Sequence, residues 1–334
     1  MDNYVCFYTI TPFWAGEAPN KDDLEYKANV IYNSNMFTET LSKIEFMYEN
    51  DEIYFAVCKD GLIMTKLKKL DSRREDIIKQ DHLAGSIRFM KTYLKYLNSI
   101  QLILSSAVLK KESHICLKNF IIRTGEAFGF SIGSEGIGSG VPTGSTSQYL
   151  NGRYSCYYRH DIPINMDNRI LMRKSIKEEV FKVCFKDINI VIKNIEAIQI
   201  LNQFNSALSE YKNLNFIQSI IQSWCIIENY INKLFYEYLL RIDISAKRKI
   251  EEKNNTAFKK IEFLKNNQII INDKSKKMNS VRRNRNKILH KFYSNHKEVT
   301  YNDCADALEL VKDIINKVYG LDLEVSYGLA FNTL

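Results

Sequence analysis

The residues of this chain that are best suited to chemistry lie near its C-terminal end, in a strongly basic stretch. Between Lys274 and Lys291 there are eight Lys or Arg residues and no acidic residue. Inside this run Arg285 is followed by Asn286 and, four residues later, by His290. A histidine can exchange a proton near neutral pH, and an arginine can stabilise a developing negative charge. These residue types fit acid–base chemistry at a phosphate group.

The stretch that carries these residues is predicted to be a helix, because it contains no Gly or Pro. Its apolar residues fall on one helical stripe, namely Met278, Val281, Ile288, Leu289 and Phe292. Arg285 lies in the middle of this stripe, where a charge is costly unless it is paired or faces a partner. His290 lies about 140° around the helix from Arg285. A second copy of the helix, or a distorted helix end, is needed to aim both side chains at one point.

A second predicted helix, at residues 216–241, carries a charge of the opposite sign. Its apolar stripe consists of Ile220, Trp224, Ile227, Ile231, Leu234 and Phe235. Glu228 lies four residues after Trp224, inside this stripe. The simplest arrangement is a buried ion pair in which Glu228 holds the guanidinium of Arg285 in a fixed orientation. This pair could also be purely structural.

The Arg-x4-His pattern, with a polar residue directly after the Arg, resembles the signature of HEPN domains. The resemblance covers residues 175–325 and implies an all-α domain of a family that includes metal-independent ribonucleases. It implies catalytic roles for Arg285, Asn286 and His290, with Glu228 as the polar residue on an earlier helix. The basic residues expected to bind RNA beside the motif are Arg282, Arg283, Lys287 and Lys291.

The resemblance also implies a composite site between two copies of the chain, so a homodimer is expected. RNA supplies its own nucleophile, the 2′-hydroxyl group, and we therefore expect neither a metal nor another cofactor. HEPN ribonucleases occur in bacterial toxin and anti-phage systems. The expected role is that of a cytoplasmic toxin or abortive-infection effector, with an antitoxin or another defence protein as a candidate partner.

Three other functions remain open. The domain could bind RNA without cutting it, or it could be an assembly module in which Arg285 and His290 only hold a dimer together. It could also be the toxin half of a HEPN/nucleotidyltransferase pair. That subgroup shows Arg-x4-His-x-Tyr, whereas here Phe292 stands at the last place and Tyr293 follows one position late. This departure argues against modification of Tyr293.

The composition is that of a folded soluble protein. The chain has 334 residues, of which 45% are apolar and 26% charged, enough for one large domain or two ordinary ones. Residues 171–334 carry 27 Lys or Arg and 19 Asp or Glu, a net charge of +8, whereas residues 1–170 carry 20 of each. A local positive field is typical of proteins with a phosphate-bearing partner, although a solvated Lys-rich face is the alternative.

Cysteine usage and hydropathy bear on the environment of the protein. Seven scattered cysteines without a C-x-x-C motif argue against a zinc site and a disulfide framework, and for a reducing cytosol. No apolar run reaches 18 uninterrupted residues, the approximate length of a membrane-spanning helix. The most apolar stretch, residues 216–240, is therefore expected to be a buried or partner-facing helix.

The N-terminal half is predicted to be β-rich, which gives an α+β chain. The expected elements are strands at residues 4–10, 43–48, 52–58, 62–66 and 115–122, and a helix at 72–110. We expect residues 1–170 to form a small sheet covered by a helix, as an accessory or sensor domain. The Gly-rich segment 125–152 is expected to be a flexible surface loop, because no Lys-Ser or Lys-Thr follows its glycines as in a phosphate-binding loop. Residues 153–160 are predicted to be a strand, with base stacking as the alternative.

The C-terminal half is predicted to be helical throughout. The expected helices lie at residues 174–211, as one or two helices, and at 216–241, 246–266, 274–292 and 302–318. Gly320 is expected to end the last of them. Four to five antiparallel helices with short links indicate a HEPN-like bundle over residues 171–334.

Overall fold

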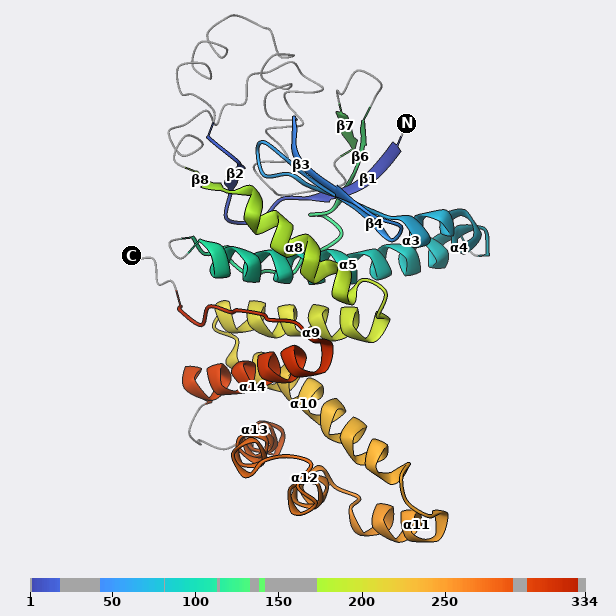
Figure 1. The fold of residues 1–334 in the computed structure, drawn as a ribbon, viewed down its shortest axis with the longest axis vertical. Helices are drawn as coiled ribbons and strands as arrows, with labels where there is room; N and C mark the ends of the chain where they lie inside the picture. The colour runs from blue at the N-terminus through green and yellow to red at the C-terminus, as the bar shows by residue number, and fades with distance from the viewer. Residues whose placement is uncertain are drawn as a thin grey trace, which may run out of the picture. The chain divides into compact units, whose positions relative to one another are not determined.

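The computed structural model describes residues 2–18, 43–80, 82–112, 115–132, 138–141, 173–290 and 299–329. The chain divides into two compact units, unit 1 (Met1–Ile198) and unit 2 (Gln199–Leu334). Unit 1 contains a small antiparallel sheet and unit 2 is mostly helical, so the α+β class is confirmed (Figure 1). The sequence places the boundary at residue 170, whereas the two compact units meet at Ile198.

Six strands of unit 1 form one antiparallel sheet in the order β3-β4-β5-β1-β6-β7. They are β1 (Asp2–Phe7), β3 (Ile44–Glu49), β4 (Ile53–Cys58), β5 (Ile63–Leu67), β6 (Phe128–Ile132) and β7 (Gly138–Val141). A separate parallel pair consists of β2 (Phe13–Ala15) and β8 (Lys174–Ile176). The four strands predicted before residue 67 are confirmed, with small shifts at their ends.

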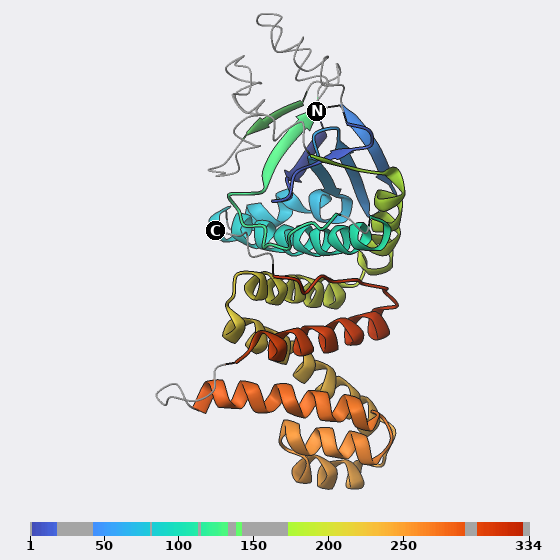
Figure 2. The same cartoon turned by 90° about the vertical axis from the view of Figure 1, so that its left-hand side faces the viewer.

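Helices cover one face of this sheet, as Figures 1 and 2 show. The helices of unit 1 are α3 (Lys68–Ser72), α4 (Arg74–Gln80), α5 (His82–Lys111) and α8 (Glu178–Val191). The Tyr93 hydroxyl of α5 accepts a hydrogen bond from the backbone N–H of Leu67 at 3.0 Å and donates one to the Thr65 carbonyl at 3.2 Å. The Phe185 ring of α8 stacks 5.4 Å from the Tyr48 ring of β3. The helix predicted to cover the sheet is therefore joined there by α8, which packs on α5.

The prediction of a single helix at residues 72–110 is wrong, because two helices, α4 and α5, occupy this stretch after α3 ends at Ser72. α4 packs back on α5. A Cβ atom at Gly85 would lie 2.3 Å from the carbonyl oxygen of Ile77, which is closer than any side chain allows. Gly85, unfavourable in an isolated helix, is the residue that lets the two helices approach.

The strand predicted at residues 115–122 is also wrong, because this segment has no regular secondary structure and pairs with no strand in the described part of the chain. Side chains of α5 satisfy its backbone instead. The Ile122 N–H donates to Asn98 Oδ1 at 2.7 Å, and Asn98 Nδ2 donates to the Ile122 carbonyl at 3.2 Å. Gln101 donates to the carbonyl of Lys118 at 3.4 Å. An asparagine on a helix thus replaces a strand neighbour.

The Gly-rich segment is a loop only in part. β6 and β7 lie within residues 125–152 and pair as a hairpin, with Gly129 opposite Val141. The prediction of an irregular loop is therefore wrong for these strands. The other residues between 133 and 172, which include the predicted element at 153–160, lie outside the described residues.

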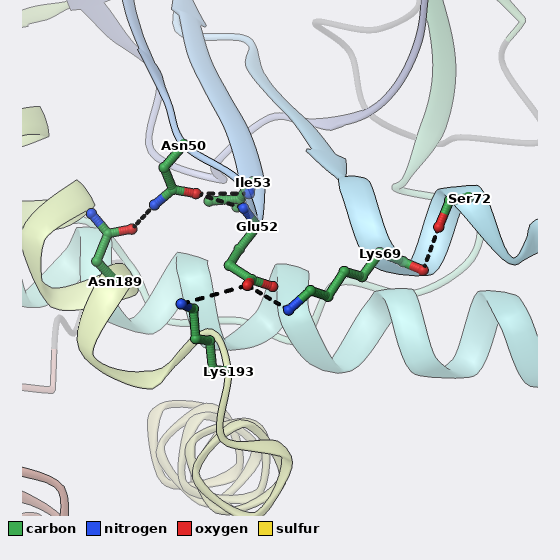
Figure 3. Close-up of polar contacts among 7 residues, drawn as sticks. All are labelled: Asn50, Glu52, Ile53, Lys69, Ser72, Asn189 and Lys193. Carbon is green, nitrogen blue, oxygen red and sulfur yellow. Dashed lines mark hydrogen bonds and ion pairs between the residues drawn. The ribbon is translucent and has the colours of Figure 1, made fainter.

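A polar network fixes the turn between β3 and β4 inside unit 1 (Figure 3). Asn50 Oδ1 accepts two backbone N–H groups of the turn, and its amide donates to Asn189 at the end of α8 at 2.6 Å. Glu52 Oε1 lies 2.6 Å from the Lys69 ammonium and 3.6 Å from that of Lys193. The hydrogen bond from Lys69 lowers the pKa of Glu52. The turn is thereby tied to α3 and to the chain after α8.

Five helices lie wholly within unit 2 among the described residues, and a sixth, α9, begins four residues before the boundary. They are α9 (Ile195–Lys212), α10 (Phe216–Leu239), α11 (Ile244–Lys253), α12 (Ala257–Asn266), α13 (Asn272–His290) and α14 (Tyr301–Tyr319). The helix predicted at residues 246–266 is two helices, because Thr256 caps a new one by accepting a hydrogen bond from the Lys259 N–H. Gly320 adopts φ +67° and ends α14, as predicted.

The predicted apolar stripe of α10 forms part of the core of unit 2. Its members Ile220, Trp224, Ile227, Ile231 and Phe235 are at most 2% exposed. Of the helices within the described ranges, none has the length and the apolar character that crossing a bilayer requires.

Candidate functional site

The helix that carries the Arg-x4-His motif, α13, packs against α10, α12 and α14, and Figure 2 shows it lying along α12. Its first half is anchored by Met278 and Val281, which are buried. In its second half Ile288 is half-buried and Leu289 is 48% exposed. The predicted apolar stripe therefore starts in the core and ends at the surface.

Arg285 is half-buried on this stripe, and Nη1 of its guanidinium donates a hydrogen bond to Asn286 Oδ1 at 3.0 Å. The predicted buried ion pair with Glu228 is wrong, since no ion pair joins these two described side chains. Glu228 is itself only half-buried on α10. Both charges keep contact with water, so burial does not force them together.

Glu228 and Arg285 nevertheless act on one point, the thiol of Cys225. Burial raises the pKa of Cys225, the Glu228 carboxylate raises it further, and the Arg285 guanidinium lowers it. Glu228 and Arg285 thus both lie close enough to Cys225 to shift the pKa of its thiol, and α10 packs against α13. Sequence reasoning missed Cys225, although it lies one turn before Glu228 on the same helix face.

His290 is the last residue of α13. Its side chain, like the whole of Lys291, lies outside the described residues. The separation between the imidazole and the Arg285 guanidinium therefore stays a prediction.

The other predicted RNA-binding residues have different surroundings. Arg283 and Lys287 are exposed on α13. Arg282 is engaged with α12, since its guanidinium lies 5.0 Å from the centre of the Phe258 ring and its Nε donates to Asn279 Oδ1 at 3.2 Å. Burial, with a smaller effect of Arg283, lowers the pKa of Arg282. Arg283 and Lys287 are the better placed of the three for direct phosphate contact.

A carboxylate on α14 holds α13 next to the motif. Asn284 Nδ2 donates to Asp303 Oδ1 at 2.9 Å. The other oxygen of Asp303 accepts from the Thr300 N–H at 3.0 Å, and the Asp303 N–H donates to Thr300 Oγ1 at 3.2 Å, so the two residues form a capping box. The Thr300 hydroxyl also donates to this carboxylate oxygen at 2.7 Å. Burial favours a higher pKa for Asp303, but the hydrogen bonds from Thr300 and Asn284, together with Lys287, outweigh burial and lower it. The carboxylate therefore stays ionised and joins the two helices.

Charge is unevenly distributed within unit 2. Residues 241–290, which include α11, α12 and α13, hold fifteen Lys or Arg and five Asp or Glu. Residues 299–329, which include α14, hold two and six. In the described part of the chain, no three His, Cys, Asp or Glu side chains gather as they would to hold a metal ion. The dominant charge of the site is that of its Lys and Arg side chains.

Comparison with known proteins shows a similarity over part of the chain and gives no function. Residues 241–327 match a family described as "Domain of unknown function (DUF4145)". No curated protein and no solved structure matches the chain. The matched range contains α11 to α14, and so includes Arg285, Asn286 and Asp303, while Cys225 and Glu228 of α10 precede it.

Proposed function

We propose that unit 2 is a HEPN-like bundle and that the protein is a metal-independent endoribonuclease, which cleaves RNA through the 2′-hydroxyl group. The observation that carries this proposal is the half-buried guanidinium of Arg285, which donates a hydrogen bond to Asn286. The same helix exposes Arg283 and Lys287. A fixed guanidinium beside exposed cations suits a phosphate group that arrives from solution.

In the proposed reaction, His290 takes the proton of the 2′-hydroxyl group while its oxygen attacks the adjacent phosphorus. The bond to the 5′ oxygen breaks, this oxygen takes up a proton, and a 2′,3′-cyclic phosphate remains. Arg285 stabilises the negative charge on the phosphate oxygens in the transition state. Asn286 orients the guanidinium through its 3.0 Å hydrogen bond, and Glu228 sets the local field from α10. A proton transfer of this kind is typically worth about 10²- to 10⁴-fold in rate.

The proposed active form is a symmetric dimer. His290 lies five positions after Arg285, about 140° around one helix, so a second α13 helps to bring the two residue types together. Leu289, 48% exposed beside the half-buried Ile288, offers apolar surface for such a contact. The site would then lie at the seam between the two copies.

A ribonuclease without a narrow substrate range would damage the cell that makes it. We therefore place the activity in the class of toxins and abortive-infection effectors of anti-phage defence, with control by an antitoxin or another defence protein. The accessory role proposed for the N-terminal sheet is to sense the signal that releases the activity.

A second candidate function is RNA binding without cleavage. The uneven charge of unit 2 favours it, because fifteen basic against five acidic residues between 241 and 290 attract a polyanion whether or not it is cut. An assay of RNA cleavage distinguishes the ribonuclease from a protein that only binds RNA.

The test uses purified protein and single-stranded RNA in the presence of EDTA. The wild-type protein should cleave this RNA and leave 2′,3′-cyclic phosphate ends. Arg285→Ala and His290→Ala should each lower the rate by at least about 10²-fold, while the melting temperature stays near that of the wild type. Lys276→Ala, which removes an exposed cation of the same helix, is the matched control and should stay active. Cleavage that requires added Mg²⁺, or that survives both substitutions, would contradict the proposal.

A further inference from the structure

Arg282, three residues before Arg285, forms a cation–π pair with Phe258 in unit 2. The guanidinium carbon of Arg282 lies 5.0 Å from the centre of the Phe258 ring. Phe258 keeps 46% of its surface exposed, so the arginine covers the ring only in part. The ring lies among helices α11 to α13, in which Lys and Arg outnumber Asp and Glu, so a partly exposed aromatic face lies in basic surroundings.

A chain of polar contacts holds Arg282 in this place. Its Nε donates to Asn279 Oδ1 at 3.2 Å, and Asn279 Nδ2 donates to Glu262 Oε1 at 3.3 Å. The other oxygen of Glu262 lies 2.9 Å from the Lys265 ammonium. Arg282 is thus oriented from α12 as well as from its own helix, and its guanidinium is committed to the ring.

We infer that Phe258 and Arg282 form a stacking platform for an unpaired nucleobase of the bound strand. Every base has a π-face, and both an aromatic ring and a guanidinium plane stack on it without sequence preference. Arg282 lies three residues before Arg285, about 4.5 Å along the helix axis. A strand with a phosphate at Arg285 would therefore place a neighbouring base within reach of the platform.

This inference rests on the proposed function, because it takes nucleic acid as the ligand, and it narrows the substrate class to RNA with unpaired bases. A base inside a duplex has both faces covered by its neighbours and cannot stack on a protein ring. Single strands, loops and bulges meet the requirement. Arg282 thereby receives a role in base stacking, while Arg283 and Lys287 remain the phosphate-binding residues.

The test measures binding of the full-length protein to a 12-nucleotide 2′-O-methyl RNA by fluorescence anisotropy. This probe lacks the free 2′-hydroxyl group, so binding is separated from cleavage. Phe258→Ala should weaken binding of the single strand roughly 5- to 150-fold and leave binding of a duplex of the same sequence unchanged. Phe258→Leu, which keeps an apolar side chain but no ring, should behave like the Ala variant. Phe258→Trp should restore binding, and its fluorescence should be quenched by the probe.

The salt dependence supplies a second criterion. Arg283→Ala should weaken single strand and duplex alike and reduce the slope of log K against log salt by about 0.7 for the single strand. Phe258→Ala should leave this slope unchanged, because a ring displaces no counterion.

Each outcome decides the matter. Equal affinity of wild-type and Phe258→Ala protein for the single strand would overturn the platform, as would equal losses for single strand and duplex. If binding follows the expected pattern but ordinary RNA is not cleaved, the stacking role of Phe258 and Arg282 is supported and the proposed ribonuclease activity is contradicted. No binding of the wild-type protein at low salt would overturn both.

Discussion

At Arg285 a permanent positive charge occupies a half-buried helical position and donates to a neutral amide, Asn286 Oδ1, at 3.0 Å. A neutral acceptor satisfies one N–H group but leaves the charge itself uncompensated. An anion that reaches this place gains a charge-assisted hydrogen bond, which is roughly twice as strong as a neutral one. Asn286 therefore orients the guanidinium without consuming the charge that a phosphate would use.

The thiol of Cys225 reports on both charges of the site. Replacing Arg285 by Gln should raise the pKa of Cys225, because a charge that lowers it is lost, and replacing Glu228 by Gln should lower it. In a protein whose Cys116 and Cys156 are changed to Ser, the rate of alkylation by iodoacetamide at pH 8 should fall in the first variant and rise in the second. Mass spectrometry of the Cys225 peptide gives these rates.

The control for this prediction is alkylation in urea, where the two variants should react alike. If the rate of Cys225 alkylation changed in the same direction in both variants, the changes would come from local packing and not from the two charges.

The residues of the site could be predicted from the sequence, but their contacts could not. Helical periodicity placed Arg285 and Glu228 inside the apolar stripes of α13 and α10, two helices that pack against each other. Periodicity gives the direction of a side chain and not its depth, so it could not tell that both positions stay half-buried. At that depth water competes with the carboxylate, and an amide from the next residue, Asn286, replaces it as the partner.

At the scale of elements, the junction between α13 and α14 is the feature on which the motif depends. The Asp303 carboxylate caps α14 through Thr300 and at the same time accepts a hydrogen bond from Asn284 of α13. One ionised group therefore sets both the start of α14 and its contact with the residue before Arg285. Loss of this group should loosen the second half of α13.

The stabilising effect of Asp303 should depend on pH. Its pKa is lowered in the folded protein, so its contribution is present above the unfolded pKa, about 3.9, and is lost as the pH falls through the lower folded value. At pH 7, Asp303→Asn should reduce the free energy of unfolding by about 1–2 kcal/mol, the usual scale of a cap and one charged hydrogen bond. The difference from the wild type should shrink toward pH 3. Urea unfolding at several pH values measures it.

Asp306→Asn is the matched control, since Asp306 lies one turn further along α14 and is exposed. Its effect should stay within about 0.5 kcal/mol at each pH. A loss for Asp303→Asn that is the same at pH 3 and pH 7 would contradict a contribution from the ionised carboxylate.

Elements whose partners are close in sequence were predicted well, and those that depend on distant groups were not. The β3-β4-β5 meander and the helices from α8 to α14 follow local patterns, apart from the break before Thr256 that divides the helix predicted at residues 246–266. The segment 115–122 has the composition of a strand, but Asn98 and Gln101 of α5 take its backbone hydrogen bonds. Similarly, Gly85 permits the close packing of α5 against the backbone of Ile77 in α4, whereas in the sequence it indicates only a weak position within one helix. Neither fact is visible in a local window.

At the scale of the whole molecule, the proposed site requires two chains. Two copies of α13 repel each other through their cations, so the proposed dimer depends on apolar contacts near Leu289, which is 48% exposed. Bound polyanion would offset the repulsion, and low salt should weaken the empty dimer.

Mixing experiments test the composite site. If each site takes Arg285 from one chain and His290 from the other, inactive Arg285→Ala and His290→Ala proteins should regain up to about half of the wild-type rate per mixed dimer, as one of its two sites is intact. If each site needs both residues from both chains, the mixture of Arg285→Ala and His290→Ala proteins stays inactive. When either variant is added to the wild-type protein, activity then falls faster than the wild-type fraction. A monomer by light scattering that keeps full activity, with a linear response to mutant dilution, would rule out the dimeric site.

The separation of charge within unit 2 has a consequence for the speed of encounter. Because the basic residues belong to α11–α13 and acidic ones predominate in α14 and the segment after it, the unit carries an electric dipole. In the field of a polyanion a dipole turns, so that α11–α13 lead the approach before any contact is made. Steering of this kind raises association rates by about 10- to 10³-fold and weakens steeply with ionic strength, while dissociation depends on the short-range contacts at Arg285 and Phe258. Added salt should therefore lower the association rate constant of an RNA strand far more than it raises the dissociation rate constant.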